Sequence, residues 1–219
     1  MADLLRDAAA GGARWLSSAE AQRLAGITAE LRRAQFLAGR WLARQALAAR
    51  WGGAPRDWAL SAPAEAAPQV TSGPVAGPGA IGLSHSGDTV ACVLADVAVG
   101  IDVERHDRRV HDVAPLADAT LGDAEHRRWL ELPDESRRVG FLSWWTLKEA
   151  WIKAQGGSLN PASLQAIEAL PASADDANAR VWREADFTLA LVGLGADAEL
   201  RVLSSVPCSM AQWWRVSGV

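Results

Sequence analysis

The segment Gly100-Ile101-Asp102-Val103-Glu104 is β-branched and alternating, which predicts a β-strand. Side chains at positions i and i+2 of a strand point to the same face, so Asp102 and Glu104 should lie side by side, with Ile101 and Val103 facing a core. Adjacent carboxylates repel each other unless a positive group lies between them, and Mg²⁺ is a natural occupant because it prefers oxygen ligands. A strand end with its acidic face in water would show the same spacing, so both interpretations stay open.

A second charged segment, WTLKEAWIK at residues 145–153, lies in a predicted helix that begins near Pro133 and ends at Gly156. Glu149 and Lys153 are four residues apart, so they share a helix face and could form an ordinary surface salt bridge. Bulky apolar neighbours indicate instead that this helix is largely buried, where one Glu and two Lys need partners. A third carboxylate for a metal and ammonium groups for a phosphate would supply these partners, and the sequence pattern leaves both interpretations open.

The segment Ser84-His85-Ser86, flanked by Gly82 and Gly87, predicts a turn that leads into a strand. Its backbone N–H groups, hydroxyls and imidazole could bind an anion. A Ser-His nucleophile pair is the competing interpretation, but neighbouring residues in a turn do not hydrogen-bond as a catalytic triad does. Plain turn chemistry is the third possibility.

The composition excludes several classes of protein. The chain has 219 residues and a formal net charge of −4, whereas a nucleic-acid binder usually has a basic patch and a high pI. It shows neither an apolar run long enough to span a bilayer nor the apolar stretch of a signal peptide. Cys92 and Cys208 form no CxxC pattern, which predicts inert thiols in a reducing compartment and hence a cytoplasmic protein. Of the 22 basic residues, 20 are Arg and two are Lys, and both lysines (Lys148 and Lys153) lie in the predicted helix.

Capping residues, apolar periodicity and Gly or Pro breakers predict the other elements. The predicted helices are a short one between a capping box at 17–20 and Gly26, a longer one at 28–50 capped by Thr28, one or two short helices in 112–131, and 133–155. The predicted strands are 58–61, a hairpin of 90–94 with 97–104, and then 164–170, 181–192 and 198–206. Helices precede strands twice, which predicts an α+β fold of two halves, an N-terminal half at 1–103 and a C-terminal half at 104–219 with the charged helix.

These motifs, taken in order, resemble the 4′-phosphopantetheinyl transferase family of the Sfp type, in which one chain forms a pseudodimer. The family pattern is an SHS turn, a G-I-D-x-E strand and a W-x-x-K-E-x-x-x-K helix, which this chain matches at 84–86, 100–104 and 145–153. The segment 38–44 also resembles the family's G-R-x-x-x-R helix. The resemblance covers roughly residues 18–160 and implies two similar α+β halves related by a pseudo-twofold axis.

The resemblance implies an activity and its partners. The enzyme would transfer 4′-phosphopantetheine from coenzyme A to a serine of an apo acyl, peptidyl or aryl carrier protein and release 3′,5′-ADP. It would depend on Mg²⁺, or on Mn²⁺ in its place, and act as a cytoplasmic monomer in fatty-acid or secondary-metabolite synthesis, without nucleic acid or membrane. A non-catalytic module that binds coenzyme A or a carrier protein is the alternative. Another Mg²⁺-dependent phosphoryl transferase would usually need a GxxxxGK[ST] loop, which the sequence lacks.

The resemblance also implies roles for individual residues. The implied metal ligands are Asp102, Glu104 and Glu149, with Glu149 also the base for the carrier serine and Lys153 the second catalytic residue. The implied coenzyme A contacts are Lys153 and Lys148 at the diphosphate, Ser84 and His85 at the phosphates, and Arg23 or Arg40 at the 3′-phosphate.

The chain departs from the family pattern at the nucleotide end of the site. Gly82 stands where the family often has Asn, and Ser72-Gly73-Pro74 stands where it often has G-K-P, so the family's lysine is missing. Glu125 resembles a further acidic position of the family.

Arginine dominates the positive charge near the proposed site. Arg32, Arg33, Arg40 and Arg44 spread around the first long helix, and a solvated face is their simplest interpretation. Because the carrier and the diphosphate are both acidic, we expect a local basic patch from this helix and from Arg105–Arg109.

Overall fold

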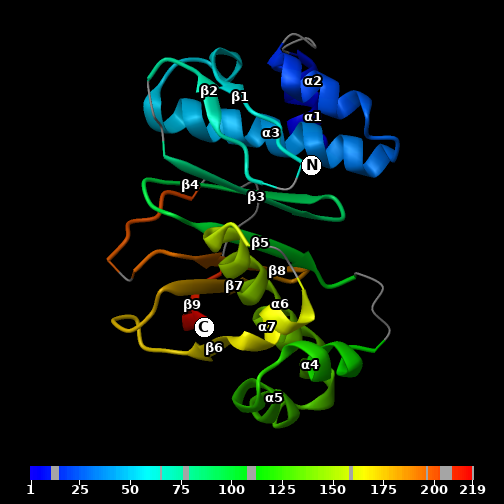
Figure 1. The fold of residues 1–219 in the computed structure, drawn as a ribbon, viewed down its shortest axis with the longest axis vertical. Coiled ribbons are helices and arrows are strands. Elements are labelled where there is room, and N and C mark those ends of the chain that lie inside the picture. Colours follow the sequence, from blue (N-terminus) through cyan, green and yellow to red (C-terminus); the bar gives the residue numbers. More distant parts are fainter. Residues whose placement is uncertain are drawn as a thin grey trace. The chain divides into compact units, whose positions relative to one another are not determined.

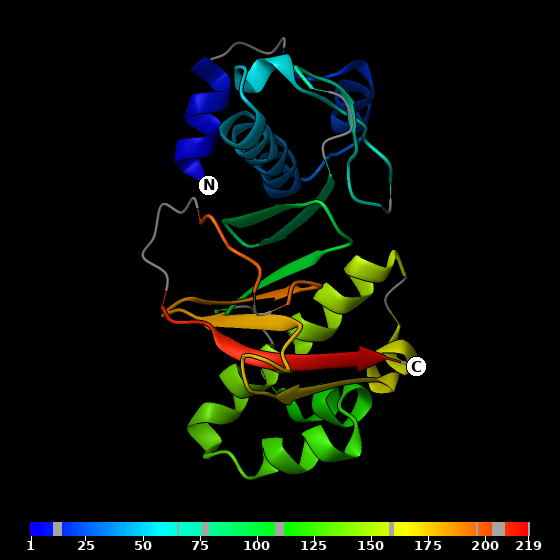
Figure 2. The ribbon, with the colours of Figure 1, turned by 90° about the vertical axis from the view of Figure 1, so that its left-hand side faces the viewer.

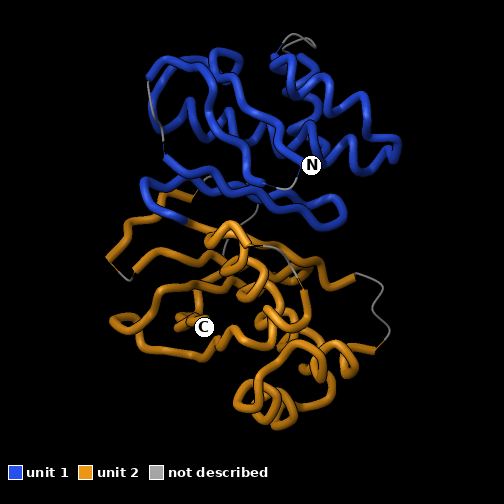
Figure 3. The backbone as a smooth tube through the Cα atoms, viewed as in Figure 1, with its two compact units in different colours: residues 1–98 blue, residues 99–219 orange. Residues whose placement is uncertain are grey.

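The computed structural model describes residues 1–10, 15–64, 66–75, 79–107, 112–157, 160–195, 197–202 and 209–218. These residues form two compact units, Met1–Ala98 and Val99–Val219 (Figure 3). The boundary predicted between residues 103 and 104 differs from this division, because it would cut a strand that is paired along its whole length within the second unit. Both units combine helices with antiparallel strands, which confirms the predicted α+β class.

The described residues of unit 1 include three α-helices, the short 3₁₀ helix η2 and two pairs of strands. In chain order they are α1 (Ala2–Ala10), α2 (Ser18–Ala25), α3 (Glu30–Trp51), η2 (Pro55–Asp57), β1 (Ala59–Leu60), β2 (Val70–Ser72), β3 (Ala80–Ser86) and β4 (Thr89–Ala95). Helix α3 packs on the β3–β4 hairpin (Figure 1), and apolar side chains fill the space between them, among them Ala43, Leu47 and Ile81.

The capping box that the sequence predicts at the start of α2 is confirmed. The Ser17 hydroxyl accepts a hydrogen bond from the Glu20 backbone N–H, and the Glu20 carboxylate accepts one from the Ser17 N–H. The cap predicted for the longer helix is wrong, because the N-cap of α3 is Ala29, which makes no side-chain cap bond, and not Thr28.

Strand β4, for which the sequence predicts a hairpin with residues 97–104, pairs with a different strand. β4 pairs antiparallel with β3, closed by a two-residue turn at Gly87 and Asp88, so the predicted hairpin of 90–94 with 97–104 is wrong. The physical reason is Gly87, whose φ of 55° is left-handed and suits a tight hairpin turn. The Ser84-His85-Ser86 segment therefore ends β3 instead of forming the turn itself.

The described residues of unit 2 form a five-stranded antiparallel sheet and four helices. In chain order its elements are β5 (Gly100–Arg105), α4 (Ala114–Thr120), α5 (Asp123–Leu130), α6 (Asp134–Gln155), α7 (Pro161–Ala166), β6 (Ile167–Pro171), β7 (Ala179–Arg183), β8 (Phe187–Val192) and β9 (Gln212–Gly218). The strand order is β5-β8-β7-β9-β6, which places β5 and β6 at the two edges of the sheet (Figure 2).

Helix α6 packs against this sheet and contacts all five strands (Figure 2). Its bounds confirm the prediction, and Gly156 ends it in the left-handed conformation with φ 66°. The core under it is continuous and includes Phe141, Leu147, Val181 and Val216. The position of α6 therefore decides which of its side chains meet the edge strand β5.

The C-terminal strand predictions are confirmed in part. The predicted run 164–170 begins as helix α7 and becomes a strand only at Ile167, and the run 181–192 is two strands, β7 and β8. Residues 198–202 form no strand, whereas the Trp-rich tail, for which no strand was predicted, forms β9. Residues 203–206, Cys208, Arg108 and Arg109 lie outside the described residues. Within the part that the structure describes, no helix is long and apolar enough to cross a membrane.

Candidate active site

The two carboxylates of β5 are buried. Asp102 is 2% exposed and Glu104 is 6% exposed, and their backbones pair with Ala190 and Thr188 of β8. The interpretation of a strand end with its acidic face in water is therefore wrong. Because a buried charge is costly without a partner, these carboxylates need compensating groups close by.

Helix α6 brings the other charged groups of the site to β5. Lys153 Nζ lies 2.6 Å from Asp102 Oδ1, and one carboxylate oxygen from each of Asp102, Glu104 and Glu149 lies within 4.8 Å of the others. Burial raises the pKa of Glu149 to about 8, with further repulsion from Asp102 and Glu104 and an opposing attraction from Lys153. Three carboxylates crowded against one ammonium group make a site with excess negative charge.

This donor set suits a hard divalent cation. Mg²⁺ takes oxygen ligands and is usually bound through one or two carboxylates plus substrate phosphates. Asp102, Glu104 and Glu149 each offer a carboxylate oxygen to one small volume. Burial, and then repulsion from Asp102 and Glu104, raise the pKa of Glu149, and a cation would relieve that repulsion. The residues present therefore fit the metal that the sequence pattern indicates.

Lys148 lies away from this cluster in a buried ion pair. Its Nζ is 2.6 Å from Glu125 Oε2 and donates to the carbonyl oxygens of Thr120 at 2.7 Å and Leu164 at 2.8 Å. The side chains of Lys148 and Glu125 are 1% and 0% exposed. These three acceptors match the three donors of an ammonium group. The placement differs from the implied diphosphate contact and gives Lys148 a structural role, joining α6 to its neighbouring helices.

In unit 1, His85 lies beside an arginine of α3. The His85 side chain is exposed, and Arg32 Nη1 lies 2.5 Å from its Nε2. A guanidinium group is the opposite of the orienting carboxylate that a Ser-His nucleophile pair would need. Ser84, by contrast, is buried within β3. Arg32 and His85 together present positive and hydrogen-bonding groups on one surface of unit 1.

The other arginines of α3 form a buried cluster. Arg44 makes a bidentate pair with Glu20 at 2.9 and 2.5 Å, and Arg40 Nη1 lies 3.8 Å from the same carboxylate. Arg40 also donates to the carbonyl oxygen of Ser61. Burial lowers the pKa of Arg40 to about 10. The predicted solvated face is therefore wrong for Arg40 and Arg44, which are 6% and 0% exposed, because α2 supplies Glu20 to them.

Arg23, the other implied 3′-phosphate contact, lies on α2. Its guanidinium donates to the carbonyl oxygen of Ala64 at 2.9 Å. The Arg23 residue as a whole is partly buried.

Comparison with protein families identifies both parts of the chain. The family described as "4'-phosphopantetheinyl transferase superfamily" matches residues 98–204, and the "4'-phosphopantetheinyl transferase N-terminal domain" matches residues 19–95. The chain belongs to the 4′-phosphopantetheinyl transferase superfamily. The first match contains the whole acidic cluster and the second contains the Arg32–His85 contact.

Curated relatives of this superfamily match over about a third of the chain. It is 40% identical over 77 residues to the 4′-phosphopantetheinyl transferase AcpT of Salmonella typhimurium, a match that covers 35% of this chain and 40% of that protein. It is 36% identical over 78 residues to psf-1 of Bacillus pumilus (36% and 32% covered) and 36% identical over 87 residues to HetI of Nostoc (39% and 35% covered). The matches thus span less than half the length of each relative.

Two solved structures resemble part of the chain. One is a holo-(acyl-carrier-protein) synthase from Bacillus anthracis in complex with CoA (3',5'-ADP), with a TM-score of 0.38, 19% identity, and 44% of this chain and 93% of that chain covered. The other is the holo-[acyl-carrier-protein] synthase of Thermotoga maritima, with a TM-score of 0.36, 32% identity, and 45% and 63% covered.

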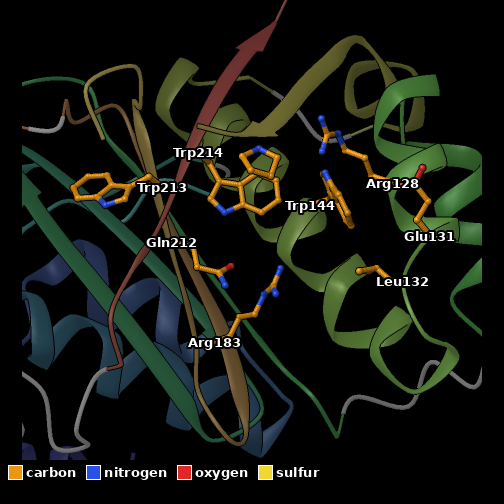
Figure 4. Close-up of a pocket in the computed structure, with 9 residues that line it drawn as sticks. Arg128, Glu131, Leu132, Trp144, Arg183, Gln212, Trp213 and Trp214 are labelled. Carbon is orange, nitrogen blue, oxygen red and sulfur yellow. The ribbon is translucent and has the colours of Figure 1, made fainter. Parts of the chain in front are cut away.

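A hollow of about 680 Å³ lies elsewhere in unit 2 (Figure 4). It is lined by side chains from α5, α6 and the sheet, among them Arg128, Trp144, Arg183 and Trp214. None of the acidic cluster residues lines it. The hollow and the acidic cluster therefore lie at different places in unit 2. We take the acidic cluster at the β5–α6 contact as the candidate active site because of the chemistry of its side chains.

Two features of the site escaped the sequence interpretation. The solvated face predicted for Arg32 is confirmed, since Arg32 is exposed, but its contact with His85, 53 residues away in the chain, is not indicated by any local pattern. The Glu20–Arg44 pair joins α2 to α3, and no local pattern marks either residue as a partner of the other. Only the packing of α3 against α2 and β3 brings these groups together.

Proposed function

We propose that this protein transfers the 4′-phosphopantetheine group of coenzyme A to a serine hydroxyl of an apo acyl or peptidyl carrier protein and releases 3′,5′-ADP. The observation that carries the proposal is the meeting of Asp102, Glu104 and Glu149 with Lys153 at one point of unit 2. Membership of the superfamily supports it, as do relatives named 4′-phosphopantetheinyl transferases.

In this proposal Asp102, Glu104 and Glu149 would hold Mg²⁺, or Mn²⁺ in its place. The bound cation would offset the charge of the diphosphate as a Lewis acid and template. The crowded carboxylates support this assignment because three neighbouring acidic groups repel one another unless a cation lies between them.

Glu149 accepts the proton of the carrier serine at a carboxylate oxygen. A bound cation would favour the ionised form of Glu149, in which its carboxylate can act as a general base. Such assistance typically contributes about 10²–10⁴-fold to the rate. Holding the serine in line with the phosphorus nearer the pantetheine would supply much of the rest.

Lys153 stabilises the charge that develops on the bridging oxygen of the diphosphate as 3′,5′-ADP leaves. Its side chain is 38% exposed, so its ammonium group can meet a substrate while staying next to Asp102. A compact ammonium on a flexible stem suits this role.

The residues that we propose for the phosphates of the nucleotide end of coenzyme A belong to unit 1. Ser84 and His85, joined here by Arg32, would bind phosphate oxygens, and Arg23 or Arg40 would bind the 3′-phosphate. Lys148 is left out of this set because its donors are used by Glu125 and two carbonyl groups. We further propose that the protein acts as a monomer in the cytoplasm.

Mass spectrometry of apo carrier proteins incubated with coenzyme A and Mg²⁺ tests the proposal. We expect a mass gain of one phosphopantetheine on at least one of several carriers from fatty-acid, polyketide and peptide synthesis. Glu149→Gln, an isosteric change, is the matched control and should nearly abolish the gain while the protein stays folded. If no carrier gains mass although the protein binds coenzyme A, the protein is a non-catalytic binding module instead.

A further inference from the structure

Gly100, the first residue of β5, lies against the backbone of α6. A Cβ atom built on Gly100 would be 1.8 Å from the carbonyl oxygen of Ala150 and 2.8 Å from the backbone nitrogen of Ala154. The φ of Gly100 is not positive, so other residues could adopt its backbone conformation. A glycine is therefore required here because the backbone of α6 occupies the space that a Cβ atom would need.

Other glycines of unit 2 do not share this property. A Cβ at Gly140 would meet the tip of the Leu132 side chain at 2.3 Å, and one at Gly218 would meet the indole of Trp151 at 2.8 Å. Side chains of this kind can rotate away, whereas a helix backbone cannot. Among the described residues of unit 2, Gly100 is the glycine whose Cβ would strike the backbone of another element closer than 3 Å.

On both β5 and α6, the residues of this contact are close in sequence to the charged residues of the cluster. Ala150 and Ala154 directly follow Glu149 and Lys153 in α6, and Asp102 comes two residues after Gly100 in β5. We propose that Gly100 is a positioning residue, whose missing side chain lets α6 approach β5 closely enough to hold Glu149 and Lys153 against the two carboxylates of the strand. The chemical consequence of this role rests on the function proposed above, but the geometric claim does not.

The size of the clash shows that the effect would reach the site. An ordinary carbon–oxygen contact needs about 3.3 Å, so a Cβ at 1.8 Å would push the helix back by roughly 1.5 Å. A catalytic arrangement tolerates only about 0.5 Å of displacement. The separation of 2.6 Å between Lys153 Nζ and Asp102 Oδ1 would then exceed hydrogen-bonding distance.

The two lysines of the chain provide a direct measurement. Protein labelled with ¹³C only in its lysine side chains gives two ε-methylene NMR signals, one from Lys148 and one from Lys153. In the parent protein, Asp102→Asn should shift the Lys153 signal and leave the Lys148 signal in place. In Gly100→Ala, we expect the Lys153 signal at the position of a solvated lysine, and adding Asp102→Asn should not move it further. The Lys148 signal, set by its buried partners, reports in the same spectrum that unit 2 is folded.

Gly140→Ala is the matched control, since it places a methyl group on α6 itself against a flexible side chain. It should leave the response of Lys153 to Asp102→Asn unchanged. Titration with Mg²⁺ gives a second readout, in which Gly100→Ala should weaken binding by about 10–100-fold and Gly140→Ala should not.

Each outcome of these measurements decides the inference. A Gly100→Ala protein whose Lys153 signal still responds to Asp102→Asn would overturn it, and so would a variant that fails to fold, because the glycine would then serve folding as a whole. If the NMR result is as expected but the parent protein modifies no carrier, the positioning role stands and the proposed function fails.

Discussion

At Lys153 the charge and the shape of the side chain make separate demands. Its ammonium group lies 2.6 Å from Asp102 within a buried acidic cluster. Lys153→Arg keeps the charge but replaces a compact group with a wide planar one. We expect transfer to fall by about 100-fold, as for a misplacement of about 1 Å. The kcat for carrier modification is the measurement, and a fully active Lys153→Arg would show that charge alone suffices.

Lys148, the other lysine of the chain, has a structural role that can be tested by measuring stability. Burial lowers the pKa of Lys148 and raises that of Glu125, so both groups resist charging and depend on each other. Lys148→Met leaves the Glu125 carboxylate buried without its ammonium partner, which should cost about 3–5 kcal/mol of unfolding free energy. Urea denaturation measures this loss.

Lys153→Met is the matched comparison for stability, because Lys153 is partly exposed. Its partner Asp102 is buried, so the variant should also lower the free energy of unfolding, but by less than Lys148→Met because solvent screens the partly exposed ammonium site. Equal losses for the two variants would contradict the structural role of Lys148.

At the scale of elements, the residues that cap α2 also form hydrogen bonds with other parts of unit 1. Ser17 accepts from the Glu20 N–H and donates to the Leu60 carbonyl oxygen at 2.8 Å, while Glu20 also binds Arg44 of α3. Ser17→Ala should therefore lower the free energy of unfolding by about 1–2 kcal/mol, the upper range for a lost N-cap. Thermal or urea unfolding checks this value.

Ser18→Ala, one residue further along, provides the control for the cap. Among the described residues Ser18 makes no side-chain hydrogen bond, and alanine has the higher helix propensity. Its unfolding should differ little from that of the parent. A loss as large as that of Ser17→Ala would show that the serines act through bulk and not through the cap.

At the scale of the whole molecule, the net charge of −4 opposes binding of an acidic carrier protein. Association then depends on local positive groups such as Arg32 beside His85. We expect kcat/KM for the carrier to fall several-fold as the salt concentration rises from about 0.01 to 1 M, because the Debye length shrinks from about 30 to 3 Å. The kcat at saturating carrier should change less. A value of kcat/KM that does not depend on salt would contradict steering by local charge.

Much of the local structure could be predicted from the sequence. The cap at Ser17 and the end of α6 at Gly156 depend on residues within one helical turn, so short patterns suffice to locate them. The alternation of 100–104 likewise predicts a strand with Asp102 and Glu104 on one face. These features follow from the backbone preferences of neighbouring residues.

The partners of these elements could not be predicted in the same way. Nothing local indicates that β5 pairs with β8 and not with β4, because the hydrogen bonds of a strand can be satisfied by any neighbour of suitable register. The same holds for Lys148 and Lys153, which lie five residues apart on one helix. Tertiary packing turns one toward Glu125 and the other toward Asp102.

The sequence by itself therefore determined the long helices, the strand β5, the superfamily resemblance and the set of charged residues available to the site. The tertiary structure decided which of those charges meet, because long-range contacts depend on how closely one backbone can approach another. At the β5–α6 contact that distance depends on Gly100, where a single methyl group would occupy the space of the Ala150 carbonyl oxygen.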